Sequence, residues 1–496
     1  MRLPPLLLLP LLAAFVIASR TPYWTPHPPH FDFANFTLGV RRFAPLDHQP
    51  HPPGYPLVIL MAQGFAAIGL STVRALHWTA MVGSLCAVAG VYQLGRSLSS
   101  QTGGLLAALL LALDPVFWFS GVNSPTRAWL AAGVSWLLYG AVGMARGRAP
   151  WLWLTAMMLA VGAGFRQELP LLLAAPLVLA ARLGGIAWRR IGLAAALALA
   201  ASLPWVLWMA RGFGSLPRML YVYYHYFLHH ISTSSAPFGA PESAWQMMLR
   251  QCLAWNGLAG ATFVLALLAS RRRASLDRRF LAMAACYFVP AALLQLLIHI
   301  GFDSPDHALG TITVLWVSAG SLLAVSRSFW VAAPAAAAAL WISFAAPGAR
   351  LPDWDMISLR TFVRDQRAVA DLLAGLRATL RPGDAIVVLD DSPVTARILG
   401  CELKQVPIVI LGAGLGTNPN RPPEAAVLVG ERQTAVAPDA IPLPGVNRLH
   451  VIAHPAGRQI RMVRERLCAS CPLDGWRLEV RPDTQVVSLP PFTLRL

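Results

Sequence analysis

Long apolar runs separated by short polar loops fill the first 346 positions of this chain. Runs of this length and composition suit helices that cross a bilayer, for which about 20 mostly apolar residues are needed. The pattern therefore predicts an α-helical polytopic membrane protein with about 11 transmembrane helices. The predicted spans are residues 3–19, 77–95, 103–120, 128–145, 151–164, 169–181, 191–210, 252–269, 280–299, 308–325 and 329–346.

One further apolar run, residues 55–70, decides the topology because it is short for a span. If it crosses the membrane and the N-terminus lies inside, most arginine-rich loops fall outside. If it is only partly embedded, the same loops fall in the cytoplasm, where Lys and Arg are enriched. We therefore predict one long outer loop over 20–76 that contains a partly embedded helix over 55–70. The arginines concerned are Arg96, Arg146, Arg148, Arg182, Arg189, Arg190, Arg271, Arg272, Arg273, Arg278, Arg279 and Arg327.

The N-terminal segment leaves two interpretations open. Arg2 and the apolar run that follows it fit a cleaved signal peptide. They equally fit a retained first helix, which we favour because the rest of the chain is polytopic. Under both interpretations the residues after Arg20 lie outside.

Beyond about residue 347 the apolar runs shorten and charged residues become more frequent. Alternation of strand-like and helix-like segments predicts a C-terminal α/β domain over 347–496, which the span count places outside the cytoplasm. The first 346 residues form the predicted transmembrane domain. The predicted helices cover 357–380, 392–403 and 459–468, and the predicted strands cover 385–389, 406–411, 449–453, 476–480 and 484–489.

Composition agrees with a membrane protein and excludes a nucleic-acid-binding one. The 496 residues are 56% hydrophobic and 13% charged, with a formal net charge of +17. The charge is almost all arginine in short loops, since Lys404 is the only lysine, and it lacks the aromatic-basic interleaving of single-strand binders. Near-exclusive use of arginine is typical of GC-rich bacterial genomes, so we expect a bacterial inner (plasma) membrane protein.

The unusual polar residues gather in the predicted outer loops, and Asp32 is the first of them. A carboxylate close to the bilayer is costly unless it is paired or functional. Asp32 precedes the apolar segment Phe33–Val40, so one interpretation is a helix N-cap. The other is a general base that receives the proton of an acceptor hydroxyl, and the two roles are compatible.

A segment rich in histidine and proline, His48–Pro56, follows in the same loop. Its prolines and glycine predict a rigid turn that leads into the embedded helix. For His51 we weigh a polar contact with substrate against a contact with Asp32 or Asp47. Two histidines and one aspartate are too few for a metal site, so we predict no metal and no cofactor.

Two arginines at predicted outer helix ends run against the cytoplasmic bias of positive charge. Arg166 lies in Gly164-Phe-Arg-Gln-Glu168, and Arg127 ends the loop Asn123-Ser-Pro-Thr-Arg127. Either can bind a lipid-linked phosphate through hydrogen bonds. An ion pair between Arg166 and Glu168, or contact with lipid headgroups, is the structural alternative.

The last outer segment with candidate chemistry is Gly301-Phe-Asp-Ser-Pro-Asp-His307. Asp303 and His307 are candidates to line the site, and a plain polar loop is the alternative.

Three features together resemble bacterial members of the GT-C glycosyltransferase superfamily, in particular family-39-like and protein O-mannosyltransferase-like enzymes. These are Asp32 in the first outer loop, the run His51–Pro56, and the segment Gly164–Glu168. The resemblance covers residues 1–346. It implies a helical membrane bundle and transfer of a sugar from a polyprenyl-phosphate carrier to an acceptor hydroxyl at the outer face.

The resemblance also implies that Asp32 acts on the acceptor, with inversion at the sugar. Many relatives have a second acid in the outer loop after the third helix, but here that loop, 121–127, has none. We therefore expect no divalent metal. The sequence leaves the sugar and the acceptor open, whether glycan, lipid or protein. Two other function classes also stay open, namely a transporter or flippase for a lipid-linked saccharide and a non-catalytic membrane scaffold.

Overall fold

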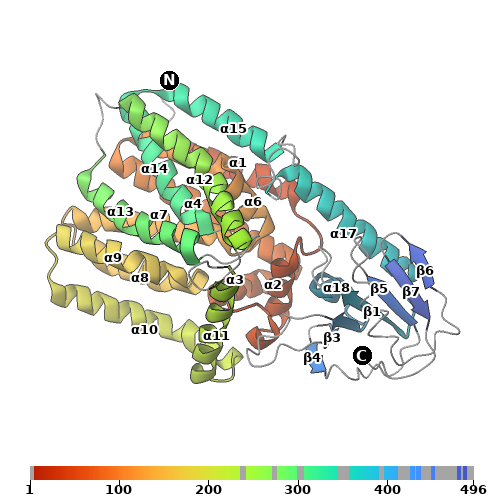
Figure 1. Cartoon of the computed structure of the whole chain (residues 1–496). Helices are drawn as coiled ribbons and strands as arrows, with labels where there is room; N and C mark the ends of the chain where they lie inside the picture. Colours follow the sequence, from red (N-terminus) through yellow and green to blue (C-terminus); the bar gives the residue numbers. More distant parts are fainter. Residues whose placement is uncertain are drawn as a thin grey trace. The chain divides into compact units, whose positions relative to one another are not determined.

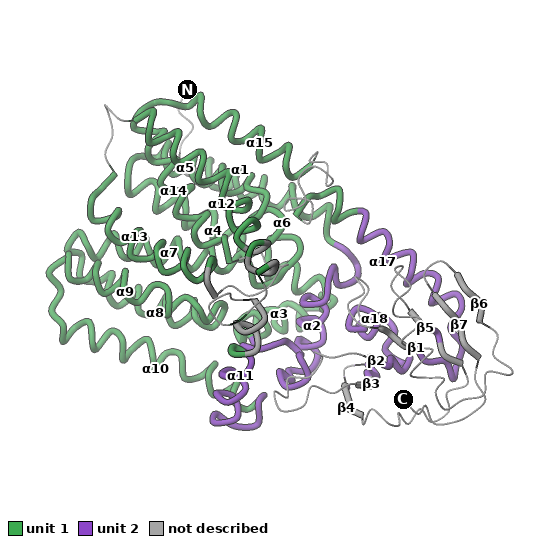
Figure 2. The backbone as a smooth tube through the Cα atoms, viewed as in Figure 1, with its two compact units in different colours: residues 1–24, 55–211, 227–363 green, residues 25–54, 212–226, 364–496 purple. Residues whose placement is uncertain are grey.

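The computed structural model divides the chain into two compact units, which Figure 2 shows in different colours. Unit 1 consists of Met1–Trp24, Tyr55–Arg211 and Phe227–Val363, and unit 2 of Thr25–Gly54, Gly212–Tyr226 and Arg364–Leu496. The linear division at residue 347 stays a prediction, and we describe each compact unit by itself. The structure describes residues 5–234, 239, 242–270, 276–298, 307–344, 357–389, 396–411, 425–430, 432–436, 448–452, 478–481 and 484–488.

Unit 1 is a bundle of helices, and each predicted apolar run overlaps one or more of them. Helices α7, α8, α9 and α13 pack side by side (Figure 1). The helices are α1 (Pro5–Arg20), α3 (Pro56–Ala67), α4 (Thr72–Leu98), α5 (Gln101–Leu113), α6 (Pro115–Asn123), α7 (Arg127–Ala145), α8 (Pro150–Phe165), α9 (Glu168–Leu183), α10 (Trp188–Gly212), α12 (Glu242–Ser270), α13 (Arg278–Leu293), α14 (Ala308–Ser326) and α15 (Ala332–Phe344).

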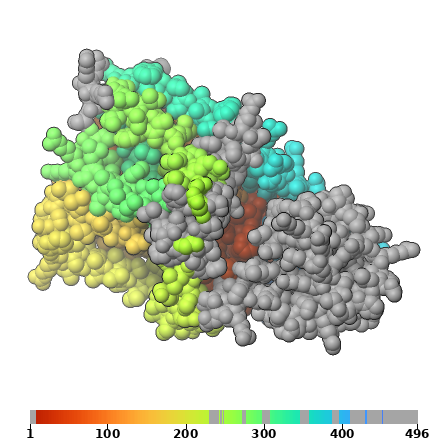
Figure 3. Space-filling view, in the orientation of Figure 1, coloured from red at the N-terminus to blue at the C-terminus, as the bar shows by residue number. Residues whose placement is uncertain are grey.

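By length and apolar composition, 6 helices among the described residues can cross a membrane, or up to 7 if a bent pair counts as one span. The multi-pass helical class is therefore confirmed, while the count of eleven stays a prediction. Of these candidates, α10 has only 6% of its apolar window buried, and its side chains lie at the surface in Figure 3. An apolar face of this kind suits contact with lipid.

The prediction of one helix over 103–120 is wrong, because the chain bends by 60° between α5 and α6. Pro115 disfavours helical geometry at the residue before it. Asp114 therefore leaves the helix and caps α6, accepting hydrogen bonds from the backbone N–H groups of Val116 and Phe117 at 2.9 and 3.1 Å. Its second oxygen accepts from the indole N–H of Trp316 at 2.9 Å.

A short helix at the predicted embedded run is confirmed as α3, which has 12 residues. At about 1.5 Å per residue it is roughly 18 Å long, well below the ~30 Å hydrocarbon core. The helix cannot cross a bilayer alone. Its embedding in the interface stays a prediction.

Arginines of separate loops meet at one end of unit 1. Arg146, after α7, donates to the Ser97 carbonyl at 2.7 Å and lies 4.0 Å from Asp277, just before α13. Arg279 donates to the Ala145 carbonyl at 2.5 Å. Arg127 lies at the opposite end of α7. Two of the arginines predicted to face the cytoplasm, Arg146 and Arg279, thus lie at the same end of the bundle, as the charge rule requires.

We expect a membrane-impermeant maleimide to label intact cells that carry Thr72→Cys but not those that carry Arg146→Cys, in a background without native cysteines. Thr72 starts α4, and Arg146 lies in the arginine-rich end. Permeabilised cells, in which both positions react, are the control. Labelling of Arg146→Cys alone would reverse the topology.

Unit 2 contains a sheet with strand order β4-β3-β2-β1-β5-β7-β6. The central strand β1 is parallel to β2 and β5, and the remaining pairs are antiparallel. Helices α2 (Phe31–Arg41) and α18 (Ala396–Glu402) belong to this unit, together with most of α17 (Leu359–Thr379) and the first half of α11 (Leu216–Ser234). The strands are β1 (Asp384–Leu389), β2 (Ile408–Leu411), β3 (Ala425–Val429), β4 (Arg432–Val436), β5 (Arg448–Ile452), β6 (Leu478–Arg481) and β7 (Thr484–Ser488).

Five of these strands overlap the predicted ones, whereas β3 and β4 were not predicted. Strand β3 begins with two alanines, and β4 carries Arg432 and Gln433, residues that do not favour strands by themselves. The two strands form by antiparallel pairing with each other, and this pairing cannot be predicted from the composition of either segment. The predicted helix over 459–468 lies outside the described residues.

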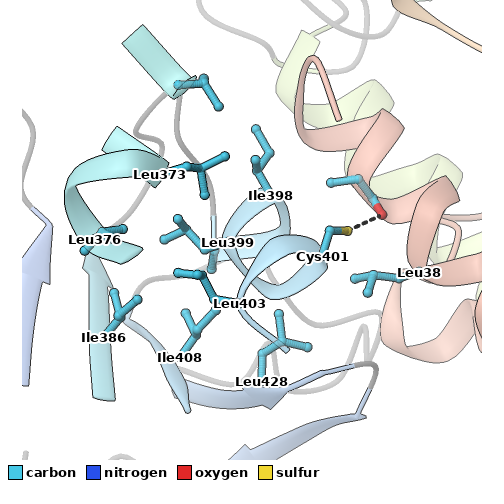
Figure 4. Packing of buried hydrophobic residues seen from close by; sticks show 13 residues of the cluster. Leu38, Leu373, Leu376, Ile386, Ile398, Leu399, Cys401, Leu403, Ile408 and Leu428 are labelled. Atoms are coloured by element: carbon cyan, nitrogen blue, oxygen red, sulfur yellow. Dashed lines mark hydrogen bonds between the residues drawn. The ribbon is translucent and has the colours of Figure 1, made fainter. Parts of the chain in front are cut away.

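One hydrophobic cluster joins distant parts of the sequence inside unit 2 (Figure 4). Ala34 and Leu38 from α2 pack with side chains from α17, α18, β1, β2 and β3. The helix that carries Asp32 therefore shares a core with residues more than 300 positions later. The other members are Val369, Leu373, Leu376, Ile386, Ala396, Ile398, Leu399, Cys401, Leu403, Ile408 and Leu428.

Candidate functional site

Asp32 lies in the first turn of α2, but it does not cap the helix. The N-cap is His30, whose Nδ1 accepts a hydrogen bond from the Asp32 backbone N–H at 3.1 Å. The cap interpretation of Asp32 is therefore wrong, because a histidine ring already occupies that role. The Asp32 carboxylate is left for other contacts, and its side chain is 37% exposed.

The contact that Asp32 makes is with His51. One oxygen of Asp32, Oδ1, lies 3.4 Å from His51 Nδ1. The ring of Phe36, one turn further along α2, packs edge-to-face on the His51 ring at a centroid distance of 5.5 Å. Of the two acids considered for His51, the structure thus selects Asp32, and the two predicted site residues come together.

A tight approach of the proline-rich turn to α2 positions His51. A Cβ atom at Gly39 would lie 2.7 Å from Pro50 Cδ, so only glycine fits at that position without displacement. Ala44 and Gln49 close the turn through mutual backbone hydrogen bonds of 2.8 and 3.1 Å. From α11, the Tyr223 hydroxyl donates to the Pro53 carbonyl.

Asp47 lies in the same turn but has a different partner. Its Oδ2 is 3.4 Å from Arg42 Nη1 at the end of α2. Burial raises the pKa of the Asp47 carboxyl, and the positive charges of Arg42 and Arg397 act against that rise. We assign Asp47 to the support of the turn, since Arg42 contacts its carboxylate and Arg397 donates to its backbone carbonyl.

A second cluster lies within unit 1, around Arg166. This residue connects α8 to α9, and its side chain is only 1% exposed. Its Nε donates to Glu168 Oε1 at 2.8 Å, and its Nη1 donates to Thr126 Oγ1 at 3.4 Å. The guanidinium carbon lies 5.8 Å from the ring centroid of Tyr55. The ion pair considered from the sequence is therefore present.

This cluster carries more positive than negative charge. Arg127, the first residue of α7, is 4% exposed and adjoins Thr126. The exposed N–H groups and the dipole at a helix N-terminus add a partial positive charge. Among the residues that the structure describes, the buried side chains of Arg166 and Arg127 thus outnumber the one carboxylate, Glu168, and this balance suits an anion such as a phosphate group.

The remaining predicted residues add less. His307 precedes α14, and its carbonyl oxygen accepts a hydrogen bond from Gln295 Nε2 at 2.9 Å. Gln295 belongs to a π-helical turn, Leu294–Ile298, after α13. Asp303 lies outside the described residues. The described part of the chain contains no group of three or more His, Cys, Asp or Glu side chains placed to hold a metal ion.

The candidate residues thus fall into two clusters, each contained in one unit. Asp32 and His51 belong to unit 2, and Arg127, Arg166 and Glu168 belong to unit 1. Sequence reasoning did not find the contact of Tyr55 with Arg166. The run that contains Tyr55 drew attention for its histidines, its prolines and its glycine, and not for Tyr55.

Comparison with known proteins gives one match to a family model and several similar solved structures. Residues 50–208 match the family model described as dolichyl-phosphate-mannose-protein mannosyltransferase. This segment contains His51 and the whole Arg166 cluster. No curated protein matches the chain.

Among solved structures, ArnT from Cupriavidus metallidurans, in a crystal with undecaprenyl phosphate, shares the fold with a TM-score of 0.60 at 13% identity. The match covers 96% of this chain and 97% of that one. The match to the Archaeoglobus fulgidus oligosaccharyltransferase, at 12% identity and a TM-score of 0.47, covers 99% of this chain and 75% of that one. The match to the mycobacterial arabinofuranosyltransferase AftD, at 14% identity and a TM-score of 0.49, covers 97% of this chain and 41% of that one.

The resemblance that the sequence motifs carry is thereby confirmed, because the family model includes the predicted run at residue 51 and the ArnT fold extends over nearly the whole chain. This chain therefore resembles the GT-C membrane glycosyltransferases, through a mannosyltransferase family model over residues 50–208 and through the fold that it shares with ArnT.

Proposed function

We propose that this protein transfers a sugar from a polyprenyl-phosphate-linked donor to an acceptor hydroxyl at the outer face of a bacterial inner membrane, with inversion at the sugar. The observation that carries the proposal is the Asp32 carboxylate, which is accessible and held beside His51 at 3.4 Å. The family description and the undecaprenyl phosphate in the ArnT crystal support a lipid-linked donor.

Asp32 is the general base of the proposed reaction. Its Oδ1 faces His51, which leaves Oδ2 for the acceptor hydroxyl. As the hydroxyl oxygen attacks the anomeric carbon, its proton passes to the carboxylate. His51 is the orienting partner, since a base held in one rotamer is already in position when the acceptor arrives.

The Arg166 cluster serves the donor phosphate. While the acceptor oxygen forms its bond to the anomeric carbon, the bond from that carbon to the phosphate oxygen breaks. Negative charge then collects on the departing polyprenyl phosphate. Arg166 and Arg127 stabilise that charge in a buried environment where electrostatic contacts are strong. Glu168 orients Arg166 through the 2.8 Å hydrogen bond to its Nε.

Metal ions and cofactors have no role in this proposal, because the arginines supply the positive charge that the leaving group requires. The C-terminal part of unit 2 lies outside the cytoplasm in the same proposal, on the side of the acceptor. Partners are the lipid-linked donor, the acceptor and the surrounding lipid, with no nucleic acid.

The direct test incubates purified protein in lipid vesicles with radiolabelled polyprenyl-phosphate sugars and a panel of hydroxyl acceptors. We expect labelled acceptor and free polyprenyl phosphate in equal amounts, with inverted anomeric configuration by NMR. The matched control for Asp32→Asn is Asp365→Asn, an exposed acid of α17 in the same unit. Movement of the lipid-linked sugar across the vesicle without any transfer would instead support a flippase, and retained configuration would refute the mechanism.

A further inference from the structure

Helix α18, more than 340 residues after His51, contacts both structural arms of the Asp32–His51 pair. The first arm is α2, which carries Asp32. Cys401 Sγ donates to the Ala34 carbonyl at 3.6 Å, and Arg41 Nη1 donates to the Cys401 carbonyl at 3.3 Å. Figure 4 shows α18 packed against Leu38 of α2 in the same hydrophobic cluster. These contacts fix α18 against the helix of the base.

The second arm is the turn that leads to His51. Arg397, one helical turn before Cys401 on α18, donates from Nη2 to the Asp47 carbonyl at 2.7 Å. Asp47 lies between Ala44 and Gln49, whose mutual backbone hydrogen bonds close the turn. His51 follows two residues after Gln49. Helix α18 therefore contacts the helix of Asp32 through Cys401, and it contacts the turn before His51 through Arg397.

Arg397 is an unusual residue for this place. It is fully buried, and its Nε and Nη1 have no hydrogen-bond partner among the described residues. Burial lowers the pKa of Arg397 to about 10, while the Asp47 carboxylate acts to raise it, so the side chain stays protonated at neutral pH. A buried cation is a poor means of packing a core, and an apolar side chain would fill the space at lower cost. Its one described hydrogen bond is the contact to the turn.

We propose that Arg397 is a positioning residue for the Asp32–His51 pair, which it sets by fixing the Asp47 carbonyl and so the distance of the turn from α2. The inference rests on the proposed function for its kinetic consequences. Loss of this donor removes the hydrogen bond that ties the part-buried Asp47 carbonyl to α18, so the turn is free to shift away from α2. A displacement of about 1 Å at a reacting group can reduce a rate by about 100-fold.

The test compares Arg397→Met, which keeps bulk but removes the donor, with Arg397→Lys, which keeps one. The matched control is Arg364→Met, because Arg364 in the same unit is 69% exposed and pairs with its neighbour Asp365 at the surface. We expect Arg397→Met to lower kcat by about 10- to 100-fold with the KM for the lipid-linked donor within about twofold. Arg397→Lys should recover most of the loss, and Arg364→Met should match wild type.

A double-mutant cycle separates positioning from a general loss of fold. If Arg397 acts through His51, then Arg397→Met should reduce kcat little further in a His51→Ala background. A purely structural role would lower kcat by the same factor in both backgrounds. Additive effects, or wild-type kcat in Arg397→Met, would overturn the proposal.

A measurement without turnover tests the same inference directly. The rate at which diethylpyrocarbonate modifies His51, whose side chain is 15% exposed in the native pair, is followed by mass spectrometry. We expect this rate to rise several-fold in Arg397→Met, while His450, buried in the sheet of the same unit, stays protected. If the rates at His51 and His450 both rise, Arg397→Met has unfolded. The rate at His51 in Arg397→Lys then decides the test. An unchanged His51 rate in both variants refutes the positioning role. An inactive wild type would refute the proposed function instead.

Discussion

Replacing Asp32 by Asn is expected to reduce sugar transfer by about 100- to 10,000-fold, the range that a general base contributes. Asn keeps the size of the side chain and its place beside His51, but it cannot accept the proton of the acceptor. Because α2 is capped by His30, the substitution should leave the helix and the stability of unit 2 unchanged. The measurement is kcat at saturating donor and acceptor.

The Asp365→Asn control should keep wild-type activity, since that acid pairs only with its neighbour Arg364 at the surface among the described residues. A scaffold function predicts that Asp32→Asn behaves like this control. Equal activity of the two variants would therefore exclude Asp32 as the base and favour a non-catalytic role for unit 2.

Replacing Arg166 by Ala is expected to reduce transfer by about 100- to 1,000-fold, the loss seen when one donor to a developing negative charge is removed. The affinity for the product polyprenyl phosphate should fall as well, measured as the inhibition constant of the product. Arg166→Lys keeps the charge but not the planar fork, so it should recover only part of the activity.

Arg182→Ala is the control for Arg166. It lies in the last turn of α9, the helix that follows Arg166, where it donates to the Ile186 carbonyl at 2.9 Å. It should therefore affect neither the rate nor product inhibition. Since Arg166→Ala also leaves Glu168 without its partner, thermal stability is measured beside activity. Unchanged product affinity in a stable Arg166→Ala variant would show that the arginine serves only the ion pair.

The sequence predicted the membrane class and the positions of the apolar helices, because both follow from local composition. It also indicated Asp32, His51 and Arg166 individually, since each is polar in a place where polarity is costly. It did not predict the bend at Asp114, where one apolar run becomes two helices. Hydropathy averaged over the run does not register a single proline.

Partner choice was beyond the sequence. The spacing of the residues was consistent with more than one partner for each side chain. The alternatives were His51 or the helix cap for Asp32, either of two acids for His51, and a phosphate group or Glu168 for Arg166. The structure places His51 beside Asp32 and Glu168 beside Arg166, because the turn at Pro50 packs on Gly39 and because α8 and α9 meet at Arg166.

By itself, then, the sequence determined that this chain is a polytopic membrane protein with a carboxylate and arginines in its predicted outer segments, since burial preference is a property of each residue. Only the tertiary structure decided that α2 shares a core with α18 and that Arg397 contacts the turn before His51. Contacts across more than 340 positions depend on how helices and strands pack. No local pattern in a single sequence records that packing.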